Sequence, residues 1–480
     1  MYDAVIIGSG PNGMAAAVRL ALEGLSVKVI EGSDTIGGGT RTQELMRPGY
    51  FHDVCSAIHP MGMGSPFLKK LPLEKYGLEW IQPDYPMAHP LDDGKAVIQY
   101  RDLDQTAEAL GPDARRYRRL IKPMVDNWEK MAPDLMAPLG FPANPVRLAA
   151  FGLNAVKPAS LLASGYKTEE AKALFGGIAA HSILPLNQPL TSAIGLVLGA
   201  AGHAVGWPLP KKGSYMIAES MASYFRELGG EIETGNMIRS FDEIPPAKAV
   251  LFDLTPRQVL GITGENFPGR YRKKLENYKY GAGVFKIDYI LKEPVPWANP
   301  ECAKAGTVHV GGTFAELMES EKTMEAKRHA EKPYVLVTQQ SNFDATRTPN
   351  NDHTLWAYCH VPSGSTKDMT EEIENQIERF APGFRDVILE KHTMHAMDFQ
   401  AYNPNYIGGD IIGGKQDIRQ QFTRPVSWYK PYKTPQKGVY FCSSSAPPGG
   451  GVHGMCGFHA AELALRDEFG FNSRNLKFSI

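Results

Sequence analysis

Apolar residues form strand-like and helix-like patterns at the two ends of the chain. Residues 3–7 and 26–30 are short runs rich in Val and Ile, typical of buried strands, with an Ala-rich helical stretch between them. Residues 438–442 form a further apolar run, and residues 459–465 have the spacing of a helix. Strands that alternate with helices in this way predict an α/β unit with a mainly parallel sheet.

The middle of the chain changes from helical to strand-forming patterns. Between residues 100 and 230 we expect mostly helices, with starts at Pro112, Thr168 and Ser214. Strand patterns then follow at residues 230–238, 248–253, 284–291, 308–311, 334–338, 354–361 and 387–397. Because the last five are β-rich and joined by long connections, they predict a second, mixed sheet.

The turn after the first strand carries a specific motif. Gly8, Gly10 and Gly13 have the Gly-x-Gly-x-x-Gly spacing between a strand and a helix. In a dinucleotide-binding turn the first glycine permits the tight turn and the second lets the backbone approach a pyrophosphate, while the third lets the helix pack on the strand. Glu31 ends the next strand, where an acid accepts hydrogen bonds from ribose hydroxyls. The pattern predicts a dinucleotide site.

A second glycine-rich turn, Gly37–Gly39 followed by Arg41, bears on which dinucleotide is bound. It would bring further backbone and a guanidinium to the same pyrophosphate, which an NAD site does not need. With these motifs the chain resembles FAD proteins of the flavin amine oxidase and phytoene dehydrogenase superfamily. Many members place Arg directly after Gly-Gly, whereas here it stands at position 41. Residues 49–60 and 403–410 resemble the phytoene dehydrogenase-like branch.

The C-terminal part of the chain resembles the same superfamily. A loop at residues 447–454 precedes the predicted helix, whose positive end would face that loop. In this superfamily the equivalent helix faces the isoalloxazine ring and stabilises negative charge on the reduced flavin. The resemblance extends over nearly the whole chain and implies FAD as the cofactor. The residues assigned to FAD binding are Gly8, Gly10, Pro11, Asn12, Gly13, Glu31, Gly32, Gly38, Gly39, Arg41, Ile238, Gly450, Gly451, Val452 and His453.

The resemblance also implies a discontinuous domain arrangement within an α/β fold. We expect a Rossmann-type FAD-binding domain that comprises residues 1–75, 205–280 and 425–480. An inserted α+β substrate domain would comprise residues 76–204 and 281–424, with a mixed sheet and a helical part. The substrate cavity should lie between this domain and the flavin.

Lys286 is the first candidate for chemistry. Its segment, residues 280–291, resembles the phytoene dehydrogenase-like branch and, more loosely, the flavin amine oxidase strand whose lysine holds a water against flavin N5. A desolvated lysine there would have a lowered pKa and would assist proton removal or oxygen reduction. The alternative is an exposed residue on an alternating strand, since Lys286 and Asp288 share one face and Phe285 and Ile287 the other.

Other candidates lie close to the flavin loop or in segments that resemble the branch. His453 follows the loop glycines, so we expect it to contact the cofactor, either as an acid or base or as a hydrogen-bonding residue. His59, His181 and Trp207 are candidates for the substrate pocket, with core packing as the alternative. Cys456 is close to the loop, but a small thiol at the start of a helix needs no covalent link to the flavin.

Composition narrows the classes of function. The chain has 480 residues, 43% of them hydrophobic, and a formal net charge of -1, so it can form a large core and has no basic excess for nucleic acid. The five dispersed cysteines include no Cys-x-x-Cys pair, and no His and carboxylate cluster indicates a metal site. The first strand begins directly after Met1, which leaves no room for a signal peptide. A cytoplasmic location is expected.

Residues 145–165 form a modestly amphipathic, helix-like stretch with two interpretations. The apolar positions either pack into the core or form a lipid-facing entrance for an apolar substrate at a membrane surface. No segment has the roughly twenty apolar residues that cross a bilayer. We therefore expect at most a peripheral membrane contact.

These expectations combine into one function. We expect an FAD-dependent oxidoreductase, similar to phytoene desaturases, that transfers hydride between a C–C or C–heteroatom bond of a bulky apolar substrate and flavin N5. Only one Gly-x-Gly-x-x-Gly turn is followed by a strand with its acid, so the expected electron acceptor is oxygen, a quinone or another carrier. A flavin amine oxidase-type enzyme and a non-catalytic, FAD-stabilised escort or scaffold protein are the alternatives.

Overall fold

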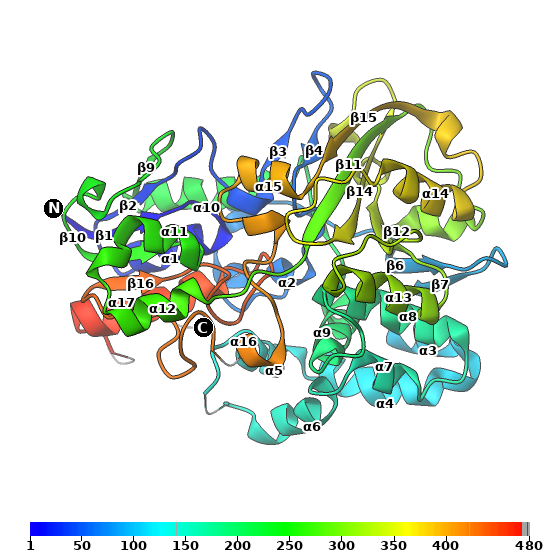
Figure 1. Ribbon diagram of the computed structural model, residues 1–480, viewed down its shortest axis with the longest axis horizontal. Helices are drawn as coiled ribbons and strands as arrows, with labels where there is room; N and C mark the ends of the chain where they lie inside the picture. The colour runs from blue at the N-terminus through cyan, green and yellow to red at the C-terminus, as the bar shows by residue number, and fades with distance from the viewer. Residues whose placement is uncertain (141, 422, 473–477, 479–480) are drawn as a thin grey trace.

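The computed structural model describes residues 1–140, 142–421, 423–472 and 478. Figure 1 shows a sheet with its helices near the N-terminus, a larger sheet beside it, and a group of helices below the larger sheet. The mixed α/β architecture predicted from the sequence is confirmed.

The first sheet is parallel and has the strand order β16-β10-β1-β2-β9. Its strands are β1 (Tyr2–Ile7), β2 (Val27–Ile30), β9 (Glu231–Glu233), β10 (Ala247–Phe252) and β16 (Val439–Phe441). Helix α1 (Pro11–Ala21) packs between α10 (Tyr215–Glu227) and α17 (Met455–Phe469). The near-continuous apolar runs seen in the sequence follow from this arrangement, because helices cover the faces of a parallel sheet.

The second sheet is mixed and has the order β15-β11-β14-β13-β12-β6-β7. Only β12 and β6 pair in parallel; the other neighbours are antiparallel. Its strands are β6 (Tyr85–Pro90), β7 (Ala96–Gln99), β11 (Gly283–Leu291), β12 (Ala305–Val310), β13 (Val335–Thr338), β14 (His353–Val361) and β15 (Ile388–Met394). The sequence patterns predicted the last five. They missed β6 and β7, because Pro86 and Pro90 interrupt the first of these.

Two faces of the second sheet are covered differently. Ile373 and Ile377 of α14 (Thr370–Phe380) belong to the same apolar cluster as Phe285 and Ile287 of β11. The opposite face, which carries Lys286, is covered by the helical group that includes α8 (Glu169–Ala179) and α13 (Phe314–Glu325). This second face is called the inner face below.

The helical group begins where the sequence predicted. Helix α4 (Ala114–Val125) follows Pro112, and Thr168 caps α8 by accepting a hydrogen bond from the Ala171 N–H at 3.3 Å. The other helices are α2 (Pro60–Met63), α3 (Leu103–Ala109), α5 (Trp128–Leu135), α6 (Pro145–Ala155), α7 (Ala159–Ala163), α9 (Thr191–Ala204), α11 (Pro256–Thr263), α12 (Gly269–Glu276), α15 (Ala396–Tyr402) and α16 (Ile418–Gln421). Two short antiparallel pairs, β3 (Thr42–Gln43) with β4 (His52–Asp53) and β5 (Trp80–Ile81) with β8 (Leu209–Pro210), complete the sheets.

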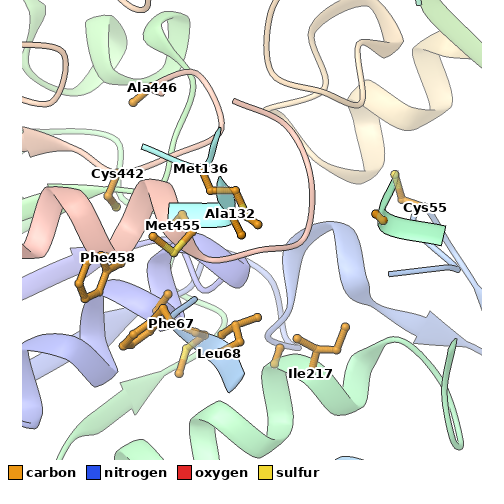
Figure 2. Close-up of a cluster of buried hydrophobic side chains, with 14 of the residues drawn as sticks. Cys55, Phe67, Leu68, Ala132, Met136, Ile217, Cys442, Ala446, Met455 and Phe458 are labelled. Atoms are coloured by element: carbon orange, nitrogen blue, oxygen red, sulfur yellow. The ribbon is translucent and has the colours of Figure 1, made fainter. Parts of the chain in front are cut away.

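A continuous apolar core joins the parallel sheet to the helical group. Figure 2 shows Phe67, Met455 and Phe458 in this core, and the ring centroids of Phe67 and Phe458 are 5.0 Å apart. Met136, at the end of α5, lies in the same cluster, and its carbonyl is 3.0 Å from His459 Nε2 of α17. Helix α17 thereby contacts Phe67 through Phe458 and Met136 through His459.

The stretch at residues 145–165 differs from its core interpretation. It is two helices, α6 and α7, and it exposes Val146 by 82% and Leu153 by 71%. Val156 and Leu161 are also exposed, while only the small Ala155 of α6 is buried. The core interpretation therefore fails for Val146 and Leu153 of α6, whereas Phe151 of the same helix packs against the core. Within the described ranges, no helix combines the length and the apolar character needed to cross a membrane.

Candidate active site

The predicted glycine-rich turn joins β1 to α1. Gly8 has a φ of 100°, a conformation that L side chains rarely adopt. A Cβ on Gly13 would lie only 2.1 Å from the Gly8 carbonyl oxygen, so the close contact of turn and helix requires glycine there. Pro11 occupies the first turn of α1, so the N-terminus of this helix directly follows the glycine-rich turn. Local geometry thus makes an anion-binding turn.

Glu31 follows β2 and is held by several donors. Its Oε2 accepts the Ser9 backbone N–H at 2.9 Å, and its Oε1 accepts the Ser33 N–H at 2.9 Å. Arg41 Nη2 lies 3.1 Å from Oε1. Glu31 is only 8% exposed, and these hydrogen bonds hold its carboxylate beside the glycine-rich turn. A ribose hydroxyl would share these oxygens with the donors already present.

The second glycine-rich turn touches the first. Gly37 and Gly38 both have positive φ, and a Cβ on Gly38 would lie 3.1 Å from the Gly10 Cα. Arg41 donates from Nε to the Thr35 carbonyl at 3.1 Å, and its guanidinium lies 5.5 Å from the Tyr402 ring centroid. The structure places Arg41 as a support of Glu31 that also borders the pocket.

One elongated pocket runs along the ends of β1, β2 and β10. Most of the predicted FAD-binding residues line it, namely Gly8, Gly10, Pro11, Asn12, Glu31, Gly32, Gly38, Gly39, Arg41, Ile238, Gly450, Gly451 and Val452. Gly13 and His453 do not line it. Sequence patterns missed the lining residues Asp253, Thr255, Ser443 and Asn236, which follow strands or sit in turns without a motif of their own. Asn405 and Tyr406, from the segment 403–410 that resembles the phytoene dehydrogenase-like branch, also line the pocket.

His453 supports the start of α17. Its Nδ1 accepts the Met455 N–H at 3.0 Å, and its carbonyl accepts the Ser65 hydroxyl at 2.7 Å. Helix α17 begins at Met455, after the N-cap Gly454 and four residues before the predicted start at His459. Burial lowers the pKa of His453 to about 4, so the imidazole is neutral at pH 7. The geometry favours the hydrogen-bonding role over acid or base chemistry.

Lys286 is buried in the middle of β11, where its side chain is 1% exposed. It forms an ion pair with Asp288, and its Nζ lies 5.9 Å from the Trp356 ring centroid. The alternative of an exposed lysine is therefore wrong, because β14 and β15 flank the strand and the inner face is covered. Burial raises the pKa of Asp288 to about 6, and the Lys286 charge opposes that rise.

Lys286 acts electrostatically on a thiol that interacts with a residue of the cofactor pocket. Tyr406 lines the pocket and interacts with the buried Cys55. The charge of Lys286 acts on the same thiol, whose pKa burial raises to about 11. His52 completes the surroundings: its Nδ1 lies 3.7 Å from Asp288 Oδ1, and its pKa is lowered to about 3 by burial and then by Lys286. Neither Cys55 nor His52 stood out in the sequence.

The structure brings the three predicted substrate-pocket residues together. The His59 N–H donates to the Pro208 carbonyl at 2.8 Å, next to Trp207. The Trp207 and His181 ring centroids are 6.1 Å apart, and Trp207 Nε1 donates to Thr307 of the inner face at 2.9 Å. His59 Nε2 lies 2.8 Å from the Ser214 hydroxyl. Through these contacts His181 and Trp207 adjoin the inner face, and His59 adjoins the segment that carries Trp207.

The inner face carries buried polar residues that sequence patterns did not single out. His309 Nε2 lies 2.9 Å from His181 Nε2, and His360 Nδ1 lies 2.8 Å from Glu321 Oε2. Lys286 pairs across the strands with Tyr358, which stands next to His360 on the same face. In β11, β12 and β14 these residues occupy alternate positions, as residues on one face of a strand do. That alternation indicates a shared buried face only when one knows that the face is covered.

Comparison with known proteins identifies the chain. A family model described as an NAD(P)-binding Rossmann-like domain matches residues 6–71. The chain is 30% identical to one of the subunits of limonene dehydrogenase from Castellaniella defragrans, over 97% of this chain and 94% of that protein. It belongs to the FAD-dependent oxidoreductases of the flavin amine oxidase superfamily.

Two further relatives extend the comparison. Pyridine nucleotide-disulfide oxidoreductase domain-containing protein 2 of Rattus norvegicus is 23% identical over 97% of this chain and 94% of its own length. A structure of putrescine oxidase aligns with a TM-score of 0.62 and 17% identity, covering 98% of this chain and 99% of that one. The second match shows the same fold.

FAD fits the residues of this flavoenzyme. The turn from β1 to α1 excludes side chains at Gly10 and Gly13, so backbone amides are accessible to a pyrophosphate. Cys456 is buried, its thiol is 3.4 Å from the Gly449 carbonyl, and burial raises its pKa to about 12. This thiol is a hydrogen-bonded core residue at the start of α17 rather than a nucleophile.

Proposed function

We propose that this flavoenzyme dehydrogenates a bulky, largely apolar small molecule at a C–C or C–heteroatom bond, as phytoene desaturases do. The observation that carries the proposal is the buried group on the inner face of the second sheet: Lys286 pairs with Tyr358 across the strands, and its Nζ lies 5.9 Å from the Trp356 ring centroid. Bound FAD supplies the chemistry by accepting a hydride at N5. The protein positions the substrate and manages protons.

The inner face combines apolar area with few charged groups. The Trp356 and Tyr358 ring centroids are 4.9 Å apart, and both side chains are less than 10% exposed. Leu336 and Met394 are buried in the same cluster. Aromatic and aliphatic walls of this kind bind apolar substrates. The name of the relative limonene dehydrogenase, which refers to a hydrocarbon, agrees with this substrate class.

Lys286 would supply a proton and a positive charge at a fixed position. Its ion pair with Asp288 keeps it in place, and the Trp356 ring covers one side of the ammonium group. A proton at Nζ would orient a water or a substrate heteroatom next to the flavin ring. Helix α17 would place its positive end, where His453 accepts the Met455 N–H, at the flavin loop.

A flavin amine oxidase activity is the second candidate. The aromatic pair Trp356 and Tyr358 beside Lys286 favours it, because aromatic rings flank many amine sites. The escort or scaffold alternative predicts that bound FAD is not reduced by any substrate. The proposed dehydrogenase would return its electrons to oxygen, a quinone or another carrier.

The two sheets suggest which part of the chain binds FAD and which part binds the substrate. We propose that the parallel sheet is the centre of the FAD-binding domain and that the second sheet, with the helical group, is the centre of the substrate domain. The exposed side of α6 would touch a membrane from which an apolar substrate enters.

The test is anaerobic reduction of the flavin. The purified protein is mixed with monoterpenes, polyenes, acyl lipids or amines while the flavin absorption band is followed. Bleaching by one of the first three supports the dehydrogenase, and bleaching by amines alone supports the amine oxidase. If dithionite reduces the flavin but no organic compound does, the escort alternative holds.

A matched pair of variants links the reaction to the inner face. Lys286→Met should slow reduction by about 10² or more if Lys286 manages a proton. Lys292→Met removes an exposed lysine just beyond the end of the same strand and should leave the rate unchanged. Equal rates for both variants would exclude Lys286 from the chemistry.

A further inference from the structure

Asp253 touches all three glycines of the dinucleotide turn. It follows β10, and its N–H donates to the Ile7 carbonyl at 2.8 Å, which fixes its backbone beside β1. Its Oδ2 accepts the Gly13 N–H at 2.9 Å. A Cβ on Gly10 would lie 2.5 Å from the same oxygen, and a Cβ on Gly8 would lie 3.0 Å from the Asp253 carbonyl oxygen.

The position is unfavourable for a negative charge. Asp253 lines the pocket, and the salt bridges found among the described residues include none to it. The titratable groups that act on it from neighbouring elements are Glu31 after β2, Cys442 after β16 and Cys456 of α17. None of these is a cation. Burial raises the pKa of Asp253 well above its usual range and the Glu31 charge adds to the rise, while the hydrogen bonds from the Gly13 and Gly10 N–H groups oppose it.

We propose that Asp253 is a positioning residue of the FAD site: it holds the glycine-rich turn through the Gly13 N–H and is protonated in the FAD complex, so that FAD binding takes up a proton. The inference concerns the cofactor and is independent of the substrate. It explains why an acid is compatible with a pocket that receives a pyrophosphate.

The charges of the FAD pyrophosphate and of Asp253 decide how the affinity for FAD changes with pH. The pyrophosphate of FAD is an anion, and the N-terminal amides of α1 bind it next to Asp253. A carboxylate there would repel it, whereas a carboxylic acid would still accept the Gly13 N–H with one oxygen and would carry no charge. Because FAD favours the protonated form, protonation equally favours FAD. Affinity must therefore fall as the pH rises.

The experiment measures FAD binding to the apoprotein from pH 6 to 9 by quenching of flavin fluorescence. For the unchanged protein we expect the dissociation constant to rise with pH, by up to about tenfold per unit for one linked proton. Asp253→Asn keeps an acceptor for Gly13 and removes the charge, so its affinity should be high and independent of pH. Asp253→Ala loses the acceptor and should bind about fivefold more weakly at low pH. Asp242→Asn, an exposed control, should behave like the unchanged protein.

Calorimetry gives a second readout that needs no Asp253 variant. FAD binding measured in two buffers of different ionisation enthalpy should show uptake of up to one proton. Asp242→Asn, the exposed control, should retain that uptake. Absence of proton uptake by the unchanged protein would overturn the proposal. So would an Asp253→Asn variant as weak as Asp253→Ala.

Discussion

Lys286 and Asp288, two residues apart on one face of β11, form an ion pair in which each side chain is only 1% exposed. Water therefore does not solvate either charge, and each depends on the other. His52 lies 3.7 Å from the second oxygen of Asp288 but is held neutral by its low pKa of about 3. The pair is consequently the electrostatic centre of the inner face.

Removing one member of the pair should destabilise the fold more than removing both. Lys286→Met and Asp288→Leu should each cost about 3–5 kcal/mol, because each leaves a buried charge uncompensated. The double variant should recover much of this loss. Urea denaturation measures the four free energies of unfolding.

An exposed pair provides the control for this cycle. Lys304 and Glu301 are 2.8 Å apart with side chains 46% and 37% exposed. Lys304→Met should change the free energy of unfolding by about 1 kcal/mol or less. If the double variant Lys286→Met, Asp288→Leu is as unstable as the sum of its singles, the two charges do not depend on each other.

Acid should destabilise this protein strongly below pH 6.5. Burial lowers the pKa of several histidines from 6.5 to about 3 or 4: His52, His59, His89, His181, His203, His453 and His459. Each stays neutral in the fold but binds a proton when unfolded, so its contribution is lost as the pH falls from 6.5 to about 4. The loss is at most about 1.4 kcal/mol per group and pH unit.

Asp288 acts in the opposite direction. Its pKa is raised to about 6, so its stabilising contribution is present below pH 4 and lost as the pH rises to 6. One carboxyl cannot offset seven histidines. Thermal unfolding followed by circular dichroism should therefore show a melting temperature that falls steadily between pH 6.5 and 4, and His59→Gln should reduce that slope. A melting temperature independent of pH would contradict the burial of these rings.

FAD should dissociate from the protein, chemically unchanged, when the chain is unfolded. Cys456 has its thiol beside the Ala446 and Gly449 carbonyls and a pKa raised to about 12, so it is not a nucleophile towards the flavin. The other cysteines of the chain are buried and free. Precipitation with acid should release all yellow colour into the supernatant. Colour that stays with the protein pellet, and is lost in Cys456→Ser, would show a covalent link.

Local patterns predicted the cofactor half of the molecule well. Gly8, Gly10 and Glu31 lie within one short segment of chain, so spacing alone describes how β1, α1 and β2 meet. The C-terminal loop at Gly450 and Gly451 could also be placed, because the resemblance covers it. Contacts that are local, or inherited with the family, can be inferred from one sequence.

The proposed substrate side was harder to predict, because the residues that meet there are distant in the chain. His181 and His309 are separated by 128 residues, yet their Nε2 atoms are 2.9 Å apart. Lys286 shows the same limit: alternation along β11 indicated its face correctly but not whether that face was covered. Only the packing of the folded chain decides whether a face is covered. Helix α6 is the opposite case, because its apolar residues Val146 and Leu153 remain exposed.

The exposed side of α6 should bind lipid vesicles. Val146 and Leu153 are 82% and 71% exposed, and Arg147 lies on the same helix. Insertion of such side chains into the interface is favourable by roughly 1.5 kcal/mol or more each when they are fully buried. We expect the protein to sediment with vesicles of mixed zwitterionic and anionic lipid. The double variant Val146→Ser, Leu153→Ser should bind at least tenfold more weakly.

A control substitution separates this effect from general loss of apolar surface. Leu389 of β15 is 43% exposed on the second sheet, so Leu389→Ser should bind vesicles as the unchanged protein does. Both variants should retain FAD, because neither site lines the cofactor pocket. Equal vesicle binding by all three proteins would show that α6 is not the contact. Absence of binding by the unchanged protein would mean that an apolar substrate reaches the inner face from water or from a carrier.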